Sequence, residues 1–282
     1  MNTDKPLNGE KFRFVSGPAS RVSLTEIWLS RHLIIQLIIR DLVVRYRQTW
    51  LGWGWAVLNP AMHLMMYYAV FGLLVRLETP DYSAPYAVVL LCGLITWMLF
   101  SSTANVVGES LLNNLHLVKK VYFPRIVLTI ASTGVCIVDF SISVSLLGIA
   151  LPLCGFHWSP SMIPVLLFCT VMIVLSGWGL GCIFAVARLR FRDIRHVIPL
   201  VMLGGFYASP VAWTPALLPE RWEWIAAFNP VAGSITLIRH VLLNGPLPSL
   251  FSLAVMFIGS VLIAATGYRC FVHYESGVVD RE

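Results

Sequence analysis

Long stretches without a charged side chain constrain this sequence more than any other feature. Five such runs occur, at 48–75, 82–108, 140–187, 197–219 and 241–268. About 20 apolar residues are enough to cross the hydrocarbon core of a membrane, so the run at 140–187 has room for two crossings with a proline- and glycine-containing turn between them. The sequence therefore predicts an all-α integral membrane protein with six transmembrane helices, at about 54–75, 84–104, 126–151, 163–187, 197–213 and 250–268.

The cations are sorted by these crossings. Seventeen of the twenty Lys and Arg residues fall on one side of the implied membrane, whereas Arg76, Arg221 and Arg239 fall on the other. Cytoplasmic loops carry an excess of Lys and Arg, so both termini are expected in the cytoplasm. An odd number of crossings would destroy this sorting, which gives six crossings a second line of support.

The composition excludes an ordinary soluble domain. Charged residues make up 12% and hydrophobic residues 57% of the chain, against roughly 25% and 45–50% in soluble domains. We attribute the net charge of +6 to cations that face an anionic leaflet, and we expect no nucleic-acid partner. The six cysteines show no CxxC or metal-ligand spacing, so we interpret them as small buried hydrophobic residues. The first 20 residues lack the apolar core of a signal peptide, so the first crossing is expected to direct insertion.

Four regions are expected along the chain. They are a flexible cytoplasmic N-terminus at 1–22, an amphipathic interface region at 23–50, a transmembrane domain at 51–269 and a cytoplasmic tail at 270–282. Ser23 and Glu26 have the spacing of a capping box, which predicts a helix start. Apolar and cationic residues then alternate at helical spacing, with a break expected near Arg40. This helix either lies in the membrane interface or simply packs on the membrane domain.

Two cytoplasmic segments are candidates for a docking surface. In the segment 109–125, leucines recur at helical spacing with polar residues between them, which predicts a short amphipathic helix that stops before Pro124. A connector without a partner is the alternative. The segment 188–196 carries four arginines in eight positions. Arginines in that pattern can bind phosphate, but ordinary positive-inside charge is the favoured explanation from the sequence.

Five stretches carry a family resemblance: RDLVVRYRQTWLGWGWAVLNP (40–60), LVKKVYFPR (117–125), RFRDIRH (190–196), ASPVAW (208–213) and FNP (228–230). In their order and approximate spacing they resemble ABC-2 type permeases of the polysaccharide and lipid-linked glycan export family, which includes O-antigen, capsule and teichoic acid exporters. The resemblance extends from about residue 26 to residue 268. It implies a permease that moves lipid-linked polysaccharide from the cytoplasm across a bacterial inner membrane.

The resemblance also implies partners. Two copies of the chain would form a homodimer and join two copies of a separate ABC ATPase, which would bind the ATP and Mg²⁺. The chain itself has no GxxxxGK[ST] motif, and no cofactor or enzymatic activity is expected in it. The substrate would be a glycan linked to undecaprenyl pyrophosphate or a similar carrier, and the remaining contacts would be with membrane lipids.

Several residues acquire expected roles from the resemblance. The coupling helix at 109–120 would enter a groove of the ATPase through Glu109, Leu112, Leu115, His116, Lys119 and Lys120. The interface helix around 26–38 would include Glu26, Trp28 and Arg31. Cations at the substrate entrance, or in contact with the carrier phosphates, would be Arg40, Arg45, Arg47, Arg190, Arg192 and Arg195.

The segment Thr214–Ser249 is too long for a tight loop and too apolar to be a free one. Its two short apolar pieces, 222–228 and 231–243, favour re-entrant or interfacial helices. The resemblance matches them to two re-entrant helices that form an outer gate, with Trp222, Trp224, Phe228, Asn229, Pro230 and Arg239 as gate residues. Arg239 would either face the exit, where it meets an anionic group, or anchor to lipid headgroups.

Aromatic residues are abundant in the first, second and fifth predicted crossings. Their faces suit the apolar faces of sugar rings, so we expect a glycan channel lined by Tyr67, Tyr68, Phe71, Trp97, Phe100, Phe206 and Tyr207. For the deeper members, packing toward lipid is the alternative. An aromatic belt at the membrane surface accounts for tryptophans near the helix ends.

Other functions have less support in the sequence. Asp139 is the one acid well inside a predicted crossing, and it is either a substrate or gating contact or a carboxylate paired with a hydroxyl or a His. A single acid makes a poor proton relay, which disfavours ion-coupled transport. An ABC-2 exporter of another lipid or a small molecule is the alternative function. A membrane enzyme that acts on lipid-phosphate sugars is disfavoured, since Asp193 is the only acid among the arginines of 188–196.

Overall fold

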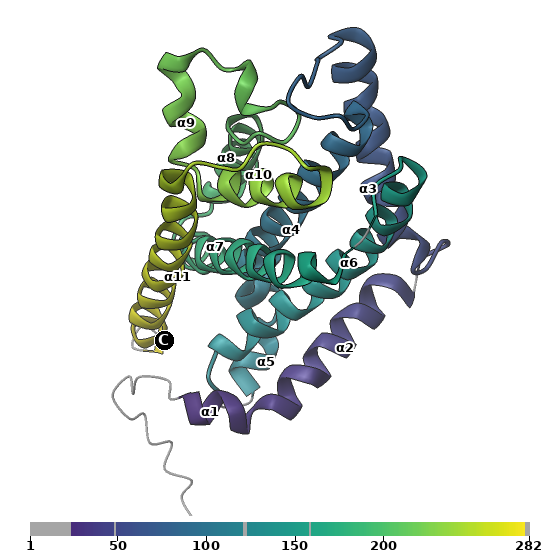
Figure 1. Cartoon of the computed structure of the whole chain (residues 1–282). Coiled ribbons are helices and arrows are strands. Elements are labelled where there is room, and N and C mark those ends of the chain that lie inside the picture. Colours follow the sequence, from purple (N-terminus) through teal and green to yellow (C-terminus); the bar gives the residue numbers. More distant parts are fainter. Residues whose placement is uncertain (1–23, 48, 121–122, 158, 280–282) are drawn as a thin grey trace, which may run out of the picture.

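The computed structural model describes residues 24–47, 49–120, 123–157 and 159–279, and Figure 1 shows the path of the chain. All regular secondary structure in these ranges is helical. Five helical stretches are long and apolar enough to cross a membrane, namely Gly54–Leu74, Tyr86–Asn113, Ile126–Leu153, Pro160–Arg190 and Leu250–Tyr274. The prediction of an all-helical, multi-pass membrane protein is therefore confirmed.

Helix α4 (Tyr86–Asn113) forms the centre of the fold and is buried along most of its length. It packs chiefly against α7 (Ile163–Arg190) and α6 (Ile126–Leu153). Helix α11 (Leu250–Val279) covers another side of α7. A single turn of 3₁₀ helix, η2 (Pro160–Met162), leads into α7. The apolar side chains of α4 thus supply the core around which the other long helices are arranged.

Glycines of α7 permit the close packing on both of its sides. A Cβ atom on Gly177 would lie 2.9 Å from the carbonyl oxygen of Phe100 in α4. A Cβ atom on Gly179 would lie 2.6 Å from the Cα atom of Ala264 in α11. Small residues that let helix backbones approach are typical of packing within membranes. The Gly-rich stretch of α7 is therefore a helix-packing surface.

The first crossing is the least buried of the five long stretches. Helix α3 (Gly54–Tyr67) continues into π-helical turns, η1 (Tyr68–Leu74), and the helix ends before Arg76, whose backbone φ is 56°. Its surface exposes many apolar side chains: Val57, Met62, Met65, Met66, Val70, Leu73 and Leu74. Within the single chain this crossing therefore leaves most of its surface uncovered.

The fifth predicted crossing, 197–213, is shorter than expected. Helix α8 (Ile194–Ala208) has 15 residues, or about 22 Å at 1.5 Å per residue, against a hydrocarbon core of about 30 Å. Helix α8 ends because Ser209 precedes Pro210, and the residue before a proline disfavours α geometry; Ser209 is extended, with ψ 146°. Residues 209–212 continue as non-helical chain buried in the protein.

The N-terminal region consists of two helices, α1 (Leu24–Leu29) and α2 (Arg31–Arg47). The break lies at Ser30, whose hydroxyl donates to the carbonyl oxygen of Glu26, and the expected break near Arg40 was wrong. One side of α2 packs against α6 through Leu37, Leu42 and Tyr46, while another exposes apolar side chains: Ile35, Ile39, Val43 and Val44. Packing on the membrane domain thus leaves a second apolar face. Ser23 lies outside the described residues.

The expected coupling helix at 109–120 is not one separate helix. Glu109 lies in the last turns of α4, Asn114 leaves helical geometry with φ −117° and ψ 19°, and a six-residue helix, α5 (Leu115–Lys120), follows. In the view of Figure 1, α1, α2, α5 and the end of α11 lie toward the lower end of the molecule. The C-terminal helix thus ends on the same side as the N-terminal helices.

The segment Thr214–Ser249 contains two α-helices, as predicted. They are α9 (Glu223–Ala227), which follows the short turns η3 (Pro215–Leu217) and η4 (Glu220–Trp222), and α10 (Pro230–Leu243). Helix α10 packs against α4, α7 and α11, and Figure 1 shows it beside the upper end of α11. Most of its residues are buried, so it belongs to the core and not to a free loop.

Candidate functional site

The residues singled out by the sequence lie near the two ends of the molecule, around one cavity and in a cluster of aromatic side chains. At the lower end, the predicted coupling residues lie on the last turns of α4 and on α5. Leu112 is 38% exposed and Leu115 is 41% exposed, and Glu109, His116 and Lys120 are also exposed. The side chain of Lys119 lies outside the described part of the structure. Leu112 and Leu115 are therefore uncovered and lie one on each side of the turn at Asn114.

A polar joint holds this turn to the neighbouring helices. The buried Asn114 donates from Nδ2 to the carbonyl oxygen of Ser110 at 2.9 Å, and its Oδ1 accepts from Arg40 Nη2 at 2.6 Å. Arg188, at the end of α7, forms an ion pair with Glu109, with 2.9 Å between Nη1 and Oε1. The end of α4 is thus tied to α2 through Arg40 and to α7 through Arg188.

The cations expected at the substrate entrance do not form one cluster but contact different partners. Arg40 pairs with Asp41 at 2.7 Å as well as with Asn114. Arg190 donates to the hydroxyl of Tyr274 in α11 and lies over the rings of Phe191 and Tyr274. Arg192 and Arg195 are joined by a hydrogen bond from Arg195 Nε to the carbonyl oxygen of Arg192. Arg47 is exposed at the end of α2.

The interface residues lie at the junction of α1 and α2. Trp28 is 70% exposed, and the guanidinium carbon of Arg31 lies 5.4 Å from the centre of its ring. Glu26, one turn before Ser30, is exposed. This cation–π contact adds to the backbone hydrogen bonds that fix the bend between the two helices.

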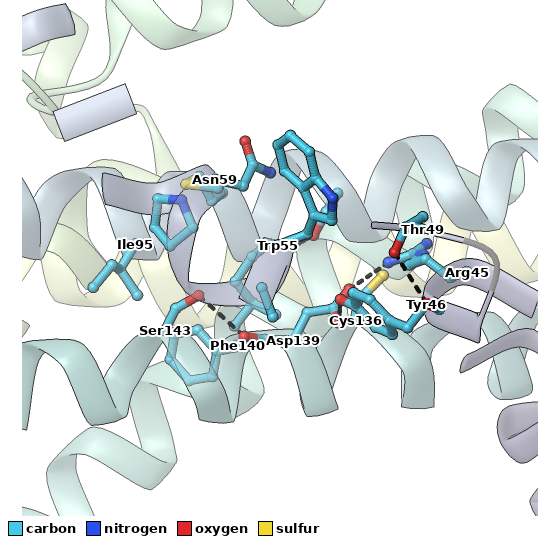
Figure 2. A pocket seen from close by; sticks show the side chains of 15 residues that line it. Arg45, Tyr46, Thr49, Trp55, Asn59, Ile95, Cys136, Asp139, Phe140 and Ser143 are labelled. Atoms are coloured by element: carbon cyan, nitrogen blue, oxygen red, sulfur yellow. Dashed lines mark hydrogen bonds and ion pairs between the residues drawn. The ribbon is translucent and has the colours of Figure 1, made fainter. Parts of the chain in front are cut away.

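An ion pair joins α2 to the middle of α6 (Figure 2). Arg45 Nη1 donates to Asp139 Oδ2, and the hydroxyl of Tyr46 donates to Asp139 Oδ1 at 2.6 Å. The hydroxyl partner of Asp139 was predicted as one of two alternatives, whereas the guanidinium partner was not. Burial, followed by the hydrogen bond to Asp139, raises the pKa of Tyr46 to about 12. The phenol therefore stays protonated and keeps donating at any physiological pH.

Arg45, Tyr46 and Asp139 line a cavity of about 440 Å³ between α2, α3, α4 and α6. Figure 2 shows Trp55 and Asn59 of α3 on one side and Cys136, Asp139 and Ser143 of α6 on the other. Its other lining residues combine hydroxyl groups with apolar side chains, namely Thr49, Ala56, Pro60, Ile95, Met98, Leu99, Ser102 and Phe140. The cavity is thus amphipathic, with its charged pair on the α2 side.

The aromatic residues expected in a channel are largely in contact with one another. Phe206 of α8 stacks on Tyr67 of α3 at 4.7 Å between ring centres, and it meets Trp97 of α4 edge-on at 6.0 Å. The cluster extends through Trp97 to Phe100, through Tyr67 to Phe71 and through Phe206 to Tyr207. Trp97, Phe100 and Phe206 are buried within the chain. Tyr68 is separate and stacks on Tyr86.

Arg239 occupies neither of its two expected positions. Its side chain is fully buried, and it donates to three carbonyl oxygens: Nε to Val89 at 3.0 Å, Nη1 to Trp213 at 3.2 Å and Nη2 to Val211 at 2.6 Å. It therefore neither faces an exit nor reaches a headgroup in this structure. Instead it ties α10 to α4 and to the non-helical chain after α8.

The other gate residues lie around the start of α10. The Asn229 side chain accepts from the backbone N–H of Val231 at 3.0 Å and donates to the hydroxyl of Ser209 at 2.8 Å. Asn229 thus caps the helix that Pro230 begins. Phe228 packs edge-on against Phe251 of α11 at 5.1 Å, and Trp222 and Trp224 are exposed.

Among the described residues, no group of three or more His, Cys, Asp or Glu side chains is arranged to hold a metal ion. All six cysteines are free thiols. The amino-acid sequence of residues 32–243 matches the model of a known protein family, described as "ABC-2 type transporter". The chain belongs to the ABC-2 type transporter family. The match covers the connection between α4 and α6, the connection between α7 and α8, and all of α10.

Individual relatives of this ABC-2 type chain are similar over most of their length. The "O-antigen export system permease protein RfbA" of Klebsiella pneumoniae is 28% identical over 239 residues, which cover 85% of this chain and 90% of that protein. The RfbA protein of Myxococcus xanthus is 28% identical over 243 residues, covering 84% and 90%. The "Polysialic acid transport protein KpsM" of Escherichia coli is 26% identical over 234 residues, covering 80% and 90%.

Sequence reasoning missed three side-chain contacts, those of Asn114 with Arg40, of Glu109 with Arg188 and of Asp139 with Arg45. Asn114 looked like a polar spacer between leucines, and its role as the joint depends on Arg40, 74 residues away. Arg188 looked like one of four equivalent arginines, yet its side chain is 8% exposed and it alone pairs with Glu109 among the described residues. The one available signal was Asp139, because a carboxylate in an apolar helix requires a partner.

Proposed function

We propose that this chain is the permease subunit of an ATP-driven ABC exporter that moves a lipid-linked polysaccharide out of the cytoplasm across a bacterial inner membrane. One observation carries the proposal. The chain is similar, over 90% of their lengths, to permeases whose names specify O-antigen export and to a polysialic acid transport protein. Both kinds of name describe polysaccharides, and the similarity includes the segments around the aromatic cluster and the lower end.

In the proposed topology the chain crosses the membrane six times, with both termini in the cytoplasm. Helix α8 together with the buried chain at 209–214 forms the fifth crossing and so brings the number of crossings to six. Non-helical backbone at membrane depth is tolerated where it is buried in protein, and Ser209, Val211 and Thr214 are all fully buried. The four regions expected from the sequence, with boundaries at 22, 50 and 269, follow from this topology.

The working assembly is a homodimer of this chain with two copies of a separate ABC ATPase that bind ATP and Mg²⁺. The uncovered apolar surface of α3 supports a second membrane-embedded partner, since such a surface must be covered by lipid or by protein. A channel between the two copies would use the aromatic residues of α3, α4 and α8. Aromatic faces would contact the sugar rings of a glycan linked to undecaprenyl pyrophosphate or a similar carrier.

Coupling to the ATPase would run through the end of α4 and α5. Movement of Leu112 and Leu115 in a groove of the ATPase would reach α7 through Glu109 and Arg188, and α2 through Asn114 and Arg40. The interface residues Glu26, Trp28 and Arg31 would lie beside this contact. The exposed Arg47, Arg192 and Arg195 would be free to meet the carrier phosphates, and α9 with the start of α10 would close the outer end.

The test is to replace Leu112 and Leu115 together by Glu in the full exporter. We expect surface polysaccharide to fall about tenfold or more, because a few apolar anchors dominate binding at an interface, while the chain still inserts in the membrane. Immunoblotting of the glycan and of the permease in the membrane fraction measures both quantities.

The matched control is Leu217→Glu in η3, since Leu217 is 40% exposed but lies at the opposite end of the molecule. Its export should remain near that of the unaltered chain. Normal export by the Leu112 and Leu115 double variant would contradict the coupling assignment. Normal surface polysaccharide in cells that lack the permease altogether would contradict the proposed substrate.

A further inference from the structure

The cavity beside Arg45 and Asp139 is not used in the proposed export path, although the family resemblance placed Arg45 among the cations at the substrate entrance. It lies between α2, α3, α4 and α6 and holds two opposite charges in surroundings that are otherwise hydroxyl-bearing and apolar. The side chains of Arg45 and Asp139 are 37% and 24% exposed, so both can be reached from the cavity. A built ion pair that faces an open space of about 440 Å³ has the size and the chemistry of a small-molecule site.

The depth of the cavity follows from its position on the first crossing. Trp55, Asn59 and Pro60 lie within the first seven residues of the 21-residue stretch Gly54–Leu74. At 1.5 Å per residue they are within about 9 Å of its first end, measured along an axis about 31 Å long. In the proposed topology that end is cytoplasmic. The α2 and α3 sides of the cavity are therefore level with the headgroups and upper acyl chains of the cytoplasmic leaflet, whereas its α6 side reaches the middle of α6 at Asp139.

The cavity also opens to the outside of the single chain, where lipid or the second copy of the chain would lie. Trp55 is 41% exposed and Asn59 is exposed, both on the side of α3 that the single chain leaves uncovered. On its inner side the cavity is lined by Ile95, Leu99 and Phe140. A ligand that enters between Trp55 and Asn59 would find apolar side chains next to a charged pair. That pattern matches an amphiphile whose polar part reaches the ion pair.

The charges of the site restrict the polar part of the ligand. A guanidinium has five N–H donors, and the described hydrogen bonding of Arg45 uses one of them, toward Asp139. Asp139 accepts from Arg45 and Tyr46 and has further lone pairs. Because the pair is neutral as a whole, a ligand that brings both a negative and a positive group can contact both side chains without leaving either charge unpaired.

We propose that this cavity binds the headgroup of a zwitterionic aminophospholipid, with its phosphate at Arg45, its primary ammonium at Asp139 and its glycerol and upper acyl chains against Trp55 and Phe140. The inference goes beyond polysaccharide export and rests on the proposed topology alone. Such a lipid would join α2 to α6 and so brace the interface helix against the membrane domain.

An anionic headgroup fits the same cavity less well. A lone phosphate drawn to Arg45 would compete with Asp139 and would leave that carboxylate without its cation near the membrane interior. Breaking a buried pair so that one charge is uncompensated is strongly unfavourable, and partial exposure reduces this cost without removing it. Lipid phosphate without an amine, including a polyprenyl pyrophosphate carrier, is therefore disfavoured at this position.

The experiment measures which lipid the assembled, full-length protein retains. The protein is purified in detergent and supplied with equal amounts of phosphatidylethanolamine, its N-methylated and N,N-dimethylated forms, phosphatidylcholine and phosphatidylglycerol, all with the same acyl chains. Native mass spectrometry then counts the bound lipids. We expect phosphatidylethanolamine to exceed phosphatidylcholine about tenfold, since the trimethylated amine keeps its charge but has no N–H donor for Asp139. The methylated forms should fall in between.

Two variants locate the site. Asp139→Asn should reduce the preference for phosphatidylethanolamine over phosphatidylcholine to near one, whereas Asp81→Asn, which removes an acid between the first two crossings, should leave it unchanged. Arg45→Gln should lower retention of both lipids. If Asp139→Asn fails to assemble, the methylation series on the unaltered protein still decides the question.

Three results would overturn the proposal. They are equal retention of phosphatidylethanolamine and phosphatidylcholine, preferred retention of phosphatidylglycerol, and an unchanged lipid preference in an assembled Asp139→Asn protein. A separate assay for surface polysaccharide keeps this test apart from that of the proposed function, because loss of export does not predict any order among the five lipids.

Discussion

Two arginines in apolar surroundings, Arg239 and Arg45, are accommodated in opposite ways. Arg239 is fully buried, and it donates to three neutral carbonyl oxygens, on α4 and on the chain after α8. Arg45 is partly exposed, faces a cavity and is neutralised by Asp139. Backbone carbonyl oxygens accept hydrogen bonds from Arg239, whereas the carboxylate of Asp139 neutralises the charge of Arg45.

The difference separates a fixed connection from an exchangeable one. Backbone carbonyl oxygens cannot turn away, so the guanidinium of Arg239 holds three segments in one arrangement. A side-chain pair beside a cavity can admit a third group, because both partners keep hydrogen-bonding capacity. Arg239 should therefore matter most for folding, and Arg45 should matter for what the cavity binds.

Replacing Arg239 should have the largest effect. Arg239→Met would leave the carbonyl oxygens of Val89, Val211 and Trp213 without these donors in an apolar interior, at about 1–3 kcal/mol for each orphaned group. We expect folded protein to be lost, or the melting temperature of the purified protein to fall by about 5–10 °C.

The conservative variant Arg239→Lys sharpens the point. A lysine keeps the charge, but its compact ammonium cannot span three carbonyl oxygens as the planar guanidinium does. Its melting temperature should fall nearly as far. The three hydrogen bonds of Arg239 to carbonyl oxygens are here called the clamp. A lysine variant as stable as the unaltered protein would show that the charge alone, and not the clamp, is required.

A small change next to the clamp should have the second largest effect. Gly93→Ala places a Cβ atom 2.6 Å from Arg239 Nη2 and 2.7 Å from the carbonyl oxygen of Val211. Overpacking of this kind costs about 1–3 kcal/mol. The control is Gly204→Ala in α8, where no heavy atom lies within 4 Å of the added Cβ. Equal melting temperatures for the two variants would contradict a rigid clamp.

The sequence predicted these regions unequally. Apolar runs located the starts of the five long helices to within two residues, because membrane insertion depends on local composition. Helices α4 and α11 continue past the predicted ends at 104 and 268, to Asn113 and Val279. The fifth crossing was misjudged because Pro210, which ends α8, was counted within an apolar run. The role of Arg239 depends on partners 28 and 150 residues away. No local pattern encodes whether an arginine in an apolar segment turns outward or inward.

Local sequence patterns also predicted only part of the contacts at the cavity. Asp139 predicted a partner, since an isolated carboxylate is costly inside a membrane, and Tyr46 supplied the expected hydroxyl. Arg45 was assigned to the cytoplasmic surface because it lies among other cations of an amphipathic helix. Only the packing of α2 on α6 brings it to Asp139.

The Arg45–Asp139 pair should contribute less to stability than the clamp. Arg45→Gln and Asp139→Asn should each cost about 1–2 kcal/mol, because both side chains are partly exposed and solvent screens the pair. The double variant should cost less than the two single costs combined, with a coupling of about 1 kcal/mol. Melting temperatures of the four proteins measure the cycle. Strict additivity would show that the two charges do not interact.

The smallest effect is expected for Tyr46→Phe, which removes one donor to Asp139 and leaves Arg45 in place. The loss should be about 1 kcal/mol near pH 8. Since the folded pKa of Tyr46 is raised from 10.0 to about 12, its stabilising effect is fully present below pH 10 and is lost as the pH rises through 12. The difference in melting temperature between the unaltered protein and the variant should therefore be constant from pH 7 to 9 and shrink toward pH 11. A difference that grew with pH would mean that the phenol is not a hydrogen-bond donor to Asp139.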